Sequence, residues 1–85
     1  MNLPENTQKL SQLRIGQNAL ILGFYPGNKA YRQKLLAMGL TPGVQINIQR
    51  LAPLGDPMEV KVRGYSLSLR KKECELIAVE VIQAR

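Results

Sequence analysis

The sequence predicts a mainly β fold, a small antiparallel barrel with one inserted α-helix. Short runs of alternating apolar and polar residues recur along the 85-residue chain, and glycine or proline bounds most of them. Only residues 29–38 carry apolar side chains at helical spacing. Short strands with tight turns and a single helix cannot build a parallel α/β sheet. A small antiparallel barrel is the economical solution, because it removes its own edges.

The N-terminal part is expected to hold an arm, a turn and one strand. Residues 1–8 are polar and predict a loosely ordered arm. A short turn packed on the body follows, formed by Leu10, Leu13 and Ile15. Residues 19–24 are apolar and short, which predicts a buried strand with a β-bulge at Gly23.

The helix has recognisable start and stop signals. Asn28 is a suitable N-cap, and the apolar face of residues 29–38 carries Tyr31, Leu35 and Met38. Gly39 suits the left-handed position after the last turn. Residues 41–44 then have the composition of a type II turn, which leads into the next strand.

Two strands, residues 44–50 and 58–63, are joined by a constrained loop at residues 52–57. Pro53 and Pro57 stiffen this loop, and Leu54 is the apolar residue at its tip. Such a loop is either a well-made connection or a shaped binding surface. Alternation then predicts a strand at 65–70, one helical turn at 71–76 and a last strand at 77–81, which completes a single domain over residues 1–85.

The composition excludes several classes of protein. No apolar run approaches the ~18 residues that span a bilayer, and the N-terminus does not resemble a secretory signal, so a cytoplasmic protein is expected. The chain has no histidine, which removes the usual general base and the commonest metal ligand. Its one cysteine, Cys74, lies between glutamates and is expected to be an inert packing residue. We therefore expect no catalytic residues, no cofactor and no metal site.

The net charge of +6 points to an acidic partner, a membrane surface or nucleic acid. Basic residues gather in two places, Lys29/Arg32/Lys34 and Arg70/Lys71/Lys72. Aromatic platforms for bases are few. Phe24 and Tyr65 fall in strands and Tyr31 lies on the apolar helix face, so most of the aromatic side chains are expected in the core. A basic nucleic-acid-binding barrel therefore stays as the alternative function, and a reader of proline-rich peptides is less favoured because it needs an exposed aromatic groove.

Three segments, residues 30–43, 52–57 and 67–73, resemble the FeoA family of small bacterial cytosolic proteins of ferrous iron transport. The likeness extends from about residue 10 to residue 81. It implies an SH3-like barrel and a partner, the membrane ferrous iron transporter FeoB, whose cytosolic part binds guanine nucleotides. The protein would then be a cytoplasmic regulator that reaches the inner face of the membrane through its partner. The iron association does not give this chain a convincing ligand set for Fe²⁺.

The residues suggest how such a partner would be bound. Leu54, held by Pro53 and Pro57, is the candidate apolar anchor, because a rigid anchor lowers the ordering cost of association. The candidate steering charges around it are Arg32, Lys34, Arg70, Lys71 and Lys72. Arg32 or Arg70 acting as an arginine finger on the partner's nucleotide, and weak self-association through Leu54 or Ile82, remain open.

Overall fold

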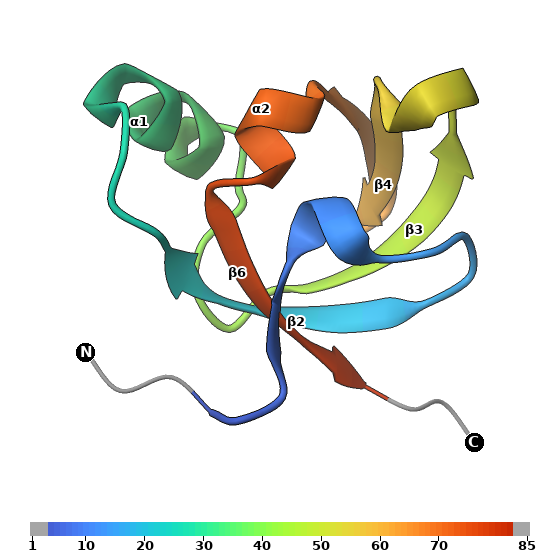
Figure 1. The fold of residues 1–85 in the computed structure, drawn as a ribbon, viewed down its shortest axis with the longest axis horizontal. Coiled ribbons are helices and arrows are strands. Elements are labelled where there is room, and N and C mark those ends of the chain that lie inside the picture. Colours follow the sequence, from blue (N-terminus) through green and yellow to red (C-terminus); the bar gives the residue numbers. More distant parts are fainter. Residues whose placement is uncertain (1–3, 83–85) are drawn as a thin grey trace.

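The computed structural model describes residues 4–82, which form one curled antiparallel sheet with a helix over one open end (Figure 1). The strands are β1 (Thr7–Lys9), β2 (Asn18–Phe24), β3 (Gln45–Leu51), β4 (Met58–Val62), β5 (Tyr65–Leu69) and β6 (Ile77–Ile82). The α-helices are α1 (Lys29–Ala37) and α2 (Lys71–Cys74), and two 3-10 turns are η1 (Leu10–Gln12) and η2 (Pro53–Gly55). The sheet order is β1-β6-β2-β3-β4-β5, so the mainly β prediction with one main helix is confirmed.

The core is built from the inward face of each alternating strand. Residues at alternate positions of β3 and β4 are buried while their neighbours are not, as a period of two requires. The largest fully buried side chains are Leu10, Ile21, Leu35, Leu40, Ile46, Ile48, Met58, Leu69 and Ile77. The register between β2 and β6 shifts between Ile21 and Gly23, which is the predicted irregularity in β2. One apolar cluster thus holds all the strands of the sheet from β2 to β6 together.

Local signals place α1 as predicted. The Asn28 side chain accepts hydrogen bonds from the backbone N–H groups of Ala30 and Tyr31, at 2.8 and 3.3 Å. Gly39 follows the helix with φ +96°, a conformation that disfavours any residue with a Cβ. A Cβ there would also clash with the Tyr65 hydroxyl, which donates a hydrogen bond to the Met38 carbonyl at 2.7 Å. Gly39 therefore lets the end of α1 approach the start of β5.

The structure corrects three expectations. Thr7 and Gln8, expected in a loose arm, belong to β1 and pair with Glu80 and Val79 of β6. Lys9 continues that strand, and its ammonium nitrogen lies 5.9 Å from the centroid of the Tyr25 ring. Residues 1–3 of the expected arm lie outside the described residues.

The other two corrections concern side chains expected to be packed. Ile15 is 58% exposed rather than packed on the body, although Leu13 in the same turn between η1 and β2 is buried. Tyr65 is 43% exposed rather than in the core, since its ring reaches along the surface to the end of α1. Both residues therefore expose to water an apolar surface that was expected in the interior.

Cys74 is buried, with its thiol 3.9 Å from the sulfur of Met58. Burial, followed by the nearby carboxylates of Glu73, Asp56 and Glu75, raises the pKa of this thiol to about 12. We therefore expect Cys74 to be unreactive at pH 8 toward a disulfide reagent such as dithionitrobenzoate until the chain unfolds. In urea the appearance of reactivity should follow the loss of circular dichroism. Rapid stoichiometric labelling of the native protein would contradict this packing.

Candidate partner-binding surface

The loop between β3 and β4 presents one apolar side chain to solvent. Leu54 is 95% exposed, the most exposed large hydrophobic residue among those described. The loop beneath it is closed by two backbone hydrogen bonds, from Gly55 N–H to Ala52 at 2.8 Å and from Ala52 N–H to Pro57 at 3.0 Å. Leu54 is therefore held out on a short, internally bonded turn and not on a slack connection.

The backbone at Leu54 makes this position costly. Leu54 has φ +69° and ψ +10°, the left-handed region in which a Cβ is crowded, at a cost of about 1 kcal/mol. Glycine or asparagine would occupy the site more easily. An exposed leucine in this conformation contributes nothing evident to folding. Its side chain is thus a candidate for a role outside the fold.

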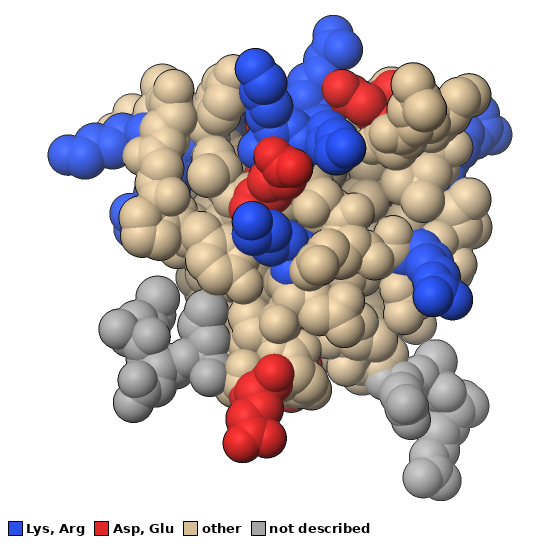
Figure 2. All heavy atoms as spheres, in the orientation of Figure 1, with Lys and Arg blue, Asp and Glu red and all other residues tan. Residues whose placement is uncertain are grey.

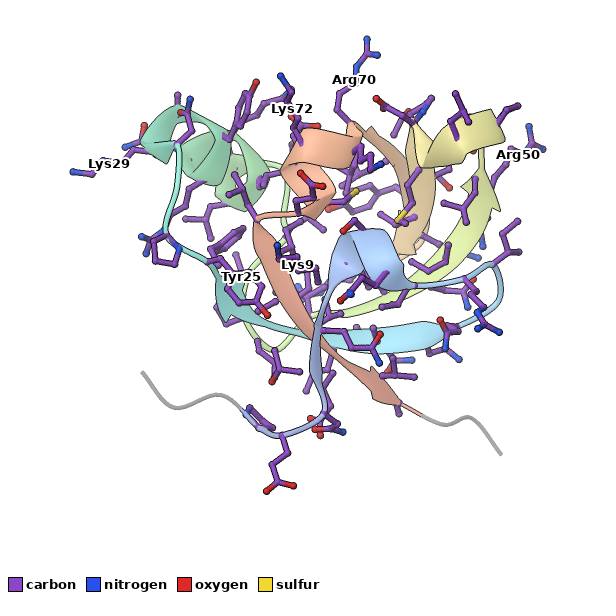
Figure 3. All side chains as sticks on the ribbon, viewed as in Figure 1. Lys9, Tyr25, Lys29, Arg50, Arg70 and Lys72 are labelled. Atoms are coloured by element: carbon purple, nitrogen blue, oxygen red, sulfur yellow. The ribbon has the colours of Figure 1, made fainter. Side chains whose placement is uncertain are left out.

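The same loop is bonded to the basic cluster at the start of α2. The Asp56 carboxylate accepts a hydrogen bond from the Lys71 backbone N–H at 3.2 Å. Arg70, Lys71 and Lys72 are all exposed. Lys and Arg side chains crowd the edge of the molecule over α1 and α2 in Figure 2, and Figure 3 shows Arg70 and Lys72 pointing away from the body. The structure therefore brings the apolar tip and the second basic cluster into one neighbourhood.

Lys34 is in a different position from the other predicted steering charges. Its ammonium group pairs with Glu73 at 2.8 Å, and the side chain of Glu73 is only 4% exposed while that of Lys34 is 57% exposed. The other oxygen of Glu73 accepts a hydrogen bond from the Arg70 backbone N–H at 2.9 Å. Much of the Lys34 charge is thus compensated inside the protein, and we expect little steering from it.

The pKa of Glu73 reflects two opposed influences. Burial, the largest influence, raises it, but the hydrogen bond from Lys34 lowers it, as do the Arg70 backbone bond and both positive charges. The lowering influences prevail together, and the pKa lies below the ordinary value. Sequence reasoning missed this contact across 39 positions. The only local signal is the capping-box spacing of Arg70 and Glu73.

Arg32 belongs to another part of the surface. It lines a hollow of about 300 Å³ at the start of α1, together with Phe24, Tyr25, Pro26, Gly27, Asn28, Lys29 and Leu76. A second, more open hollow of about 460 Å³ lies over β2, β3 and β4 and includes Lys61 and Arg63. Neither hollow gathers acidic or thiol groups. Within residues 4–82 no three His, Cys, Asp or Glu side chains are grouped as a metal site would require, and no helix is long and apolar enough to cross a membrane.

Comparison with known proteins gives a consistent picture. A model of the FeoA domain family matches residues 8–81. The fusion of Fe(2+) transport protein A with Fe(2+) transporter FeoB from Porphyromonas gingivalis is 34% identical over 76 residues. That match includes 89% of this chain but only 9% of the fusion protein, so this chain spans a small part of its relative.

Solved structures agree with the fold. The NMR structure of an FeoA-like protein from Clostridium acetobutylicum superposes with a TM-score of 0.85 at 38% identity, covering 96% of this chain and 94% of that one. A zinc complex of FeoA from Stenotrophomonas maltophilia, described as an SH3 domain protein, gives a TM-score of 0.75 at 24% identity, covering 86% of this chain and 89% of that one. At that identity the likeness concerns the fold alone, and it confirms the SH3-like barrel.

Proposed function

Since this chain belongs to the FeoA family, which is linked to ferrous iron transport, we propose that it is a non-enzymatic accessory protein that binds and regulates the cytosolic GTP-binding part of a FeoB-type transporter. The observation that carries the proposal is the Porphyromonas gingivalis fusion, in which the two proteins are one polypeptide. Covalent fusion of two proteins favours their encounter and suggests that they work together. In this proposal the protein is cytoplasmic and reaches the membrane through its partner.

The proposed contact is the surface formed by the Leu54 loop and the start of α2. Leu54 enters an apolar pocket of the transporter domain, and Pro53 and Pro57 keep its loop in the bound shape. Arg70, Lys71 and Lys72 lie beside the loop that carries this anchor and attract acidic side chains during the encounter. Arg32 and Lys34 take a smaller part, because the first lies at the start of α1 and the second is paired with Glu73.

The proposal is tested by two parallel titrations at about 0.15 M salt, where weak attraction to phosphate is already screened. Fluorescently labelled protein is titrated with the transporter's cytosolic domain and, separately, with a random-sequence oligonucleotide. Saturable binding to the transporter domain alone is the expected result. Saturation by the oligonucleotide alone, with a steep loss of affinity on adding salt, would replace the proposal with the nucleic-acid-binding alternative.

Reversing the charge of Lys71 and Lys72 together is expected to slow association with the transporter domain. Long-range attraction sets the encounter rate, so at low salt the association rate should fall by about tenfold and depend less on ionic strength. The dissociation rate should change little, because both side chains are exposed and lie at the edge of the proposed contact. Stopped-flow measurements over a salt series provide the test.

The matched control reverses Lys29 and Arg14, which carry the same charge and are exposed at the start of α1 and in the turn between η1 and β2, outside the Leu54 loop and α2. It changes the net charge equally and should slow association less. An equal effect of both pairs would show that net charge alone governs the rate. An unchanged rate for the Lys71 and Lys72 variant at low salt would remove α2 from the proposed surface.

A further inference from the structure

The sheet ends in an open edge at β5. In the order β1-β6-β2-β3-β4-β5 this strand has a neighbour on one side only, and its exposed residues include Ser66 and Ser68. Open edges carry unpaired backbone groups that can accept another strand. Natural sheets often block such an edge with proline, with a charge within the strand or with a covering segment. The sequence Tyr-Ser-Leu-Ser-Leu of β5 contains neither proline nor charge.

The register shows which backbone groups face outward. Val62 pairs with Tyr65 across a two-residue turn, so the hydrogen-bonded pairs are at Tyr65, Leu67 and Leu69. The N–H and C=O groups of Ser66 and Ser68 then point away from β4. Among the described residues no other segment supplies backbone hydrogen bonds to them. The edge thus offers two donors and two acceptors at the spacing of an antiparallel or parallel partner strand.

Positive charge stands at both ends of this edge. Arg63 precedes β5 in the turn, and Arg70, Lys71 and Lys72 follow it. Residues 58–72 contain five basic residues and one acidic residue. Arg63 has φ +46° in a turn where asparagine or glycine is favoured, so an arginine is kept there at some cost to the backbone. The edge is therefore marked at each end by a cation and is free of charge between them.

From these observations we propose that β5 binds an extended acidic peptide segment of a protein partner by strand addition. The segment pairs its backbone with Ser66 and Ser68, and its acidic ends meet Arg63 and Arg70. A second copy of this chain is a poorer occupant. In antiparallel pairing of β5 with itself, Arg63 of one copy would lie against the Arg70 to Lys72 cluster of the other, and like charges would repel. The proposal concerns the edge strand and does not depend on the identity of the transporter.

The test uses a capped seven-residue peptide that alternates Thr and Val and carries Glu at both ends. Amide resonances and hydrogen exchange of the protein are followed by NMR as peptide is added. In the free protein the amides of Leu67 and Leu69 should exchange slowly, and those of Ser66 and Ser68 fast, because only the former are bonded to β4. Saturating acidic peptide should slow exchange at Ser66 and Ser68 by about tenfold or more. The same peptide with Lys at both ends should leave them unchanged.

Two variants separate strand addition from simple charge attraction. Ser66→Pro removes one outward donor at a position where an edge strand tolerates proline, and it should lose peptide binding, while Ser66→Thr keeps the donor and should retain binding. Arg63→Gly removes a charge and relieves the positive φ, so it folds at least as well and should bind the acidic peptide about tenfold more weakly.

Three outcomes would overturn the proposal. Equal binding of the Glu and Lys peptides would remove the charge selection. Binding that shifts resonances but leaves exchange at Ser66 and Ser68 fast would place the peptide elsewhere. Protection of these two amides in the free protein that disappears on dilution would show that a second copy occupies the edge.

Discussion

Leu54→Asp is expected to abolish binding to the cytosolic domain of a FeoB-type transporter while leaving the fold intact. The side chain is 95% exposed and makes no core contact, so the substitution should leave the thermal midpoint nearly unchanged. The aspartate removes the apolar anchor, and its carboxylate would have to be desolvated in an apolar pocket. At a hot spot these effects weaken binding by about 100-fold or more, so that no saturable isotherm is expected. Isothermal titration, together with a circular dichroism melt of the same sample, measures both quantities.

Ile15→Asp is the matched control for this experiment. Ile15 is 58% exposed, is similar in size and lies in the turn between η1 and β2, outside the proposed surface. The same change of chemistry there should leave the isotherm unaltered. If Leu54→Asp binds as the parent protein does, the loop is only a well-made connection, and the proposed contact must lie elsewhere.

Leu54→Gly is a sharper test, because we expect it to raise the free energy of unfolding and to weaken binding. Glycine adopts the positive φ of this position without crowding, so the free energy of unfolding should rise by up to about 1 kcal/mol. Binding to the transporter domain should nevertheless weaken, since the anchor is removed. Urea unfolding curves and the isotherm give the two values, and a variant that is both less stable and equally tight would contradict our interpretation of the leucine.

Lys34→Met is expected to destabilise the protein more than the loss of an ordinary surface lysine would. It leaves the Glu73 carboxylate buried with its main charge partner removed. Because Lys34 is more than half exposed, solvent already weakens the pair, and we expect a loss of about 2 kcal/mol in the free energy of unfolding at pH 7. Lys29→Met is the control, an exposed lysine at the first position of the same helix.

The pH dependence of stability tests whether Glu73 causes the loss of unfolding free energy in Lys34→Met. In the folded parent protein the pKa of Glu73 lies below its ordinary value of 4.5. The contribution of Glu73 to the free energy of unfolding is therefore complete above pH 4.5 and is lost as the pH falls through the folded pKa. Without Lys34, burial dominates and the folded pKa should rise, so that the variant loses less stability on acidification. Urea unfolding between about pH 3 and pH 8 should therefore show the two curves converging in acid. A constant difference at every pH would exclude Glu73 as the source.

Much of the fold can be predicted from the sequence because strong local signals agree with the tertiary structure. Alternation identifies β3, β4 and β6, and the Asn28 cap and Gly39 delimit α1. β1 lacks such a signal, because Thr7–Lys9 is polar and its strand conformation comes from pairing with β6. The outward position of Tyr65 is likewise set by its hydrogen bond to Met38, which no local pattern contains.

The candidate site is predictable only in its parts. Two prolines around Leu54 identify a rigid loop, and the run from Arg70 to Lys72 identifies a basic segment. That the two adjoin depends on the hydrogen bond that the Lys71 backbone N–H, at the start of α2, donates to the Asp56 carboxylate 15 positions earlier in the chain. That Lys34 is not a free surface charge depends in the same way on its long-range ion pair with Glu73. Long-range contacts of this kind follow from the packing of the barrel and are not encoded in any short spacing.

The pairing of β1 with β6 has a bearing on how the domain can be tethered. It holds the first and last strands side by side, and Figure 1 shows β1 entering and β6 leaving on the side of the molecule opposite α2 and η2. A linker attached at either strand would leave the Leu54 loop and Arg70 pointing outward. A short flexible tether holds a partner at millimolar effective concentration. Joined in this way to a transporter, as in the Porphyromonas gingivalis fusion, even a weak contact would be occupied most of the time.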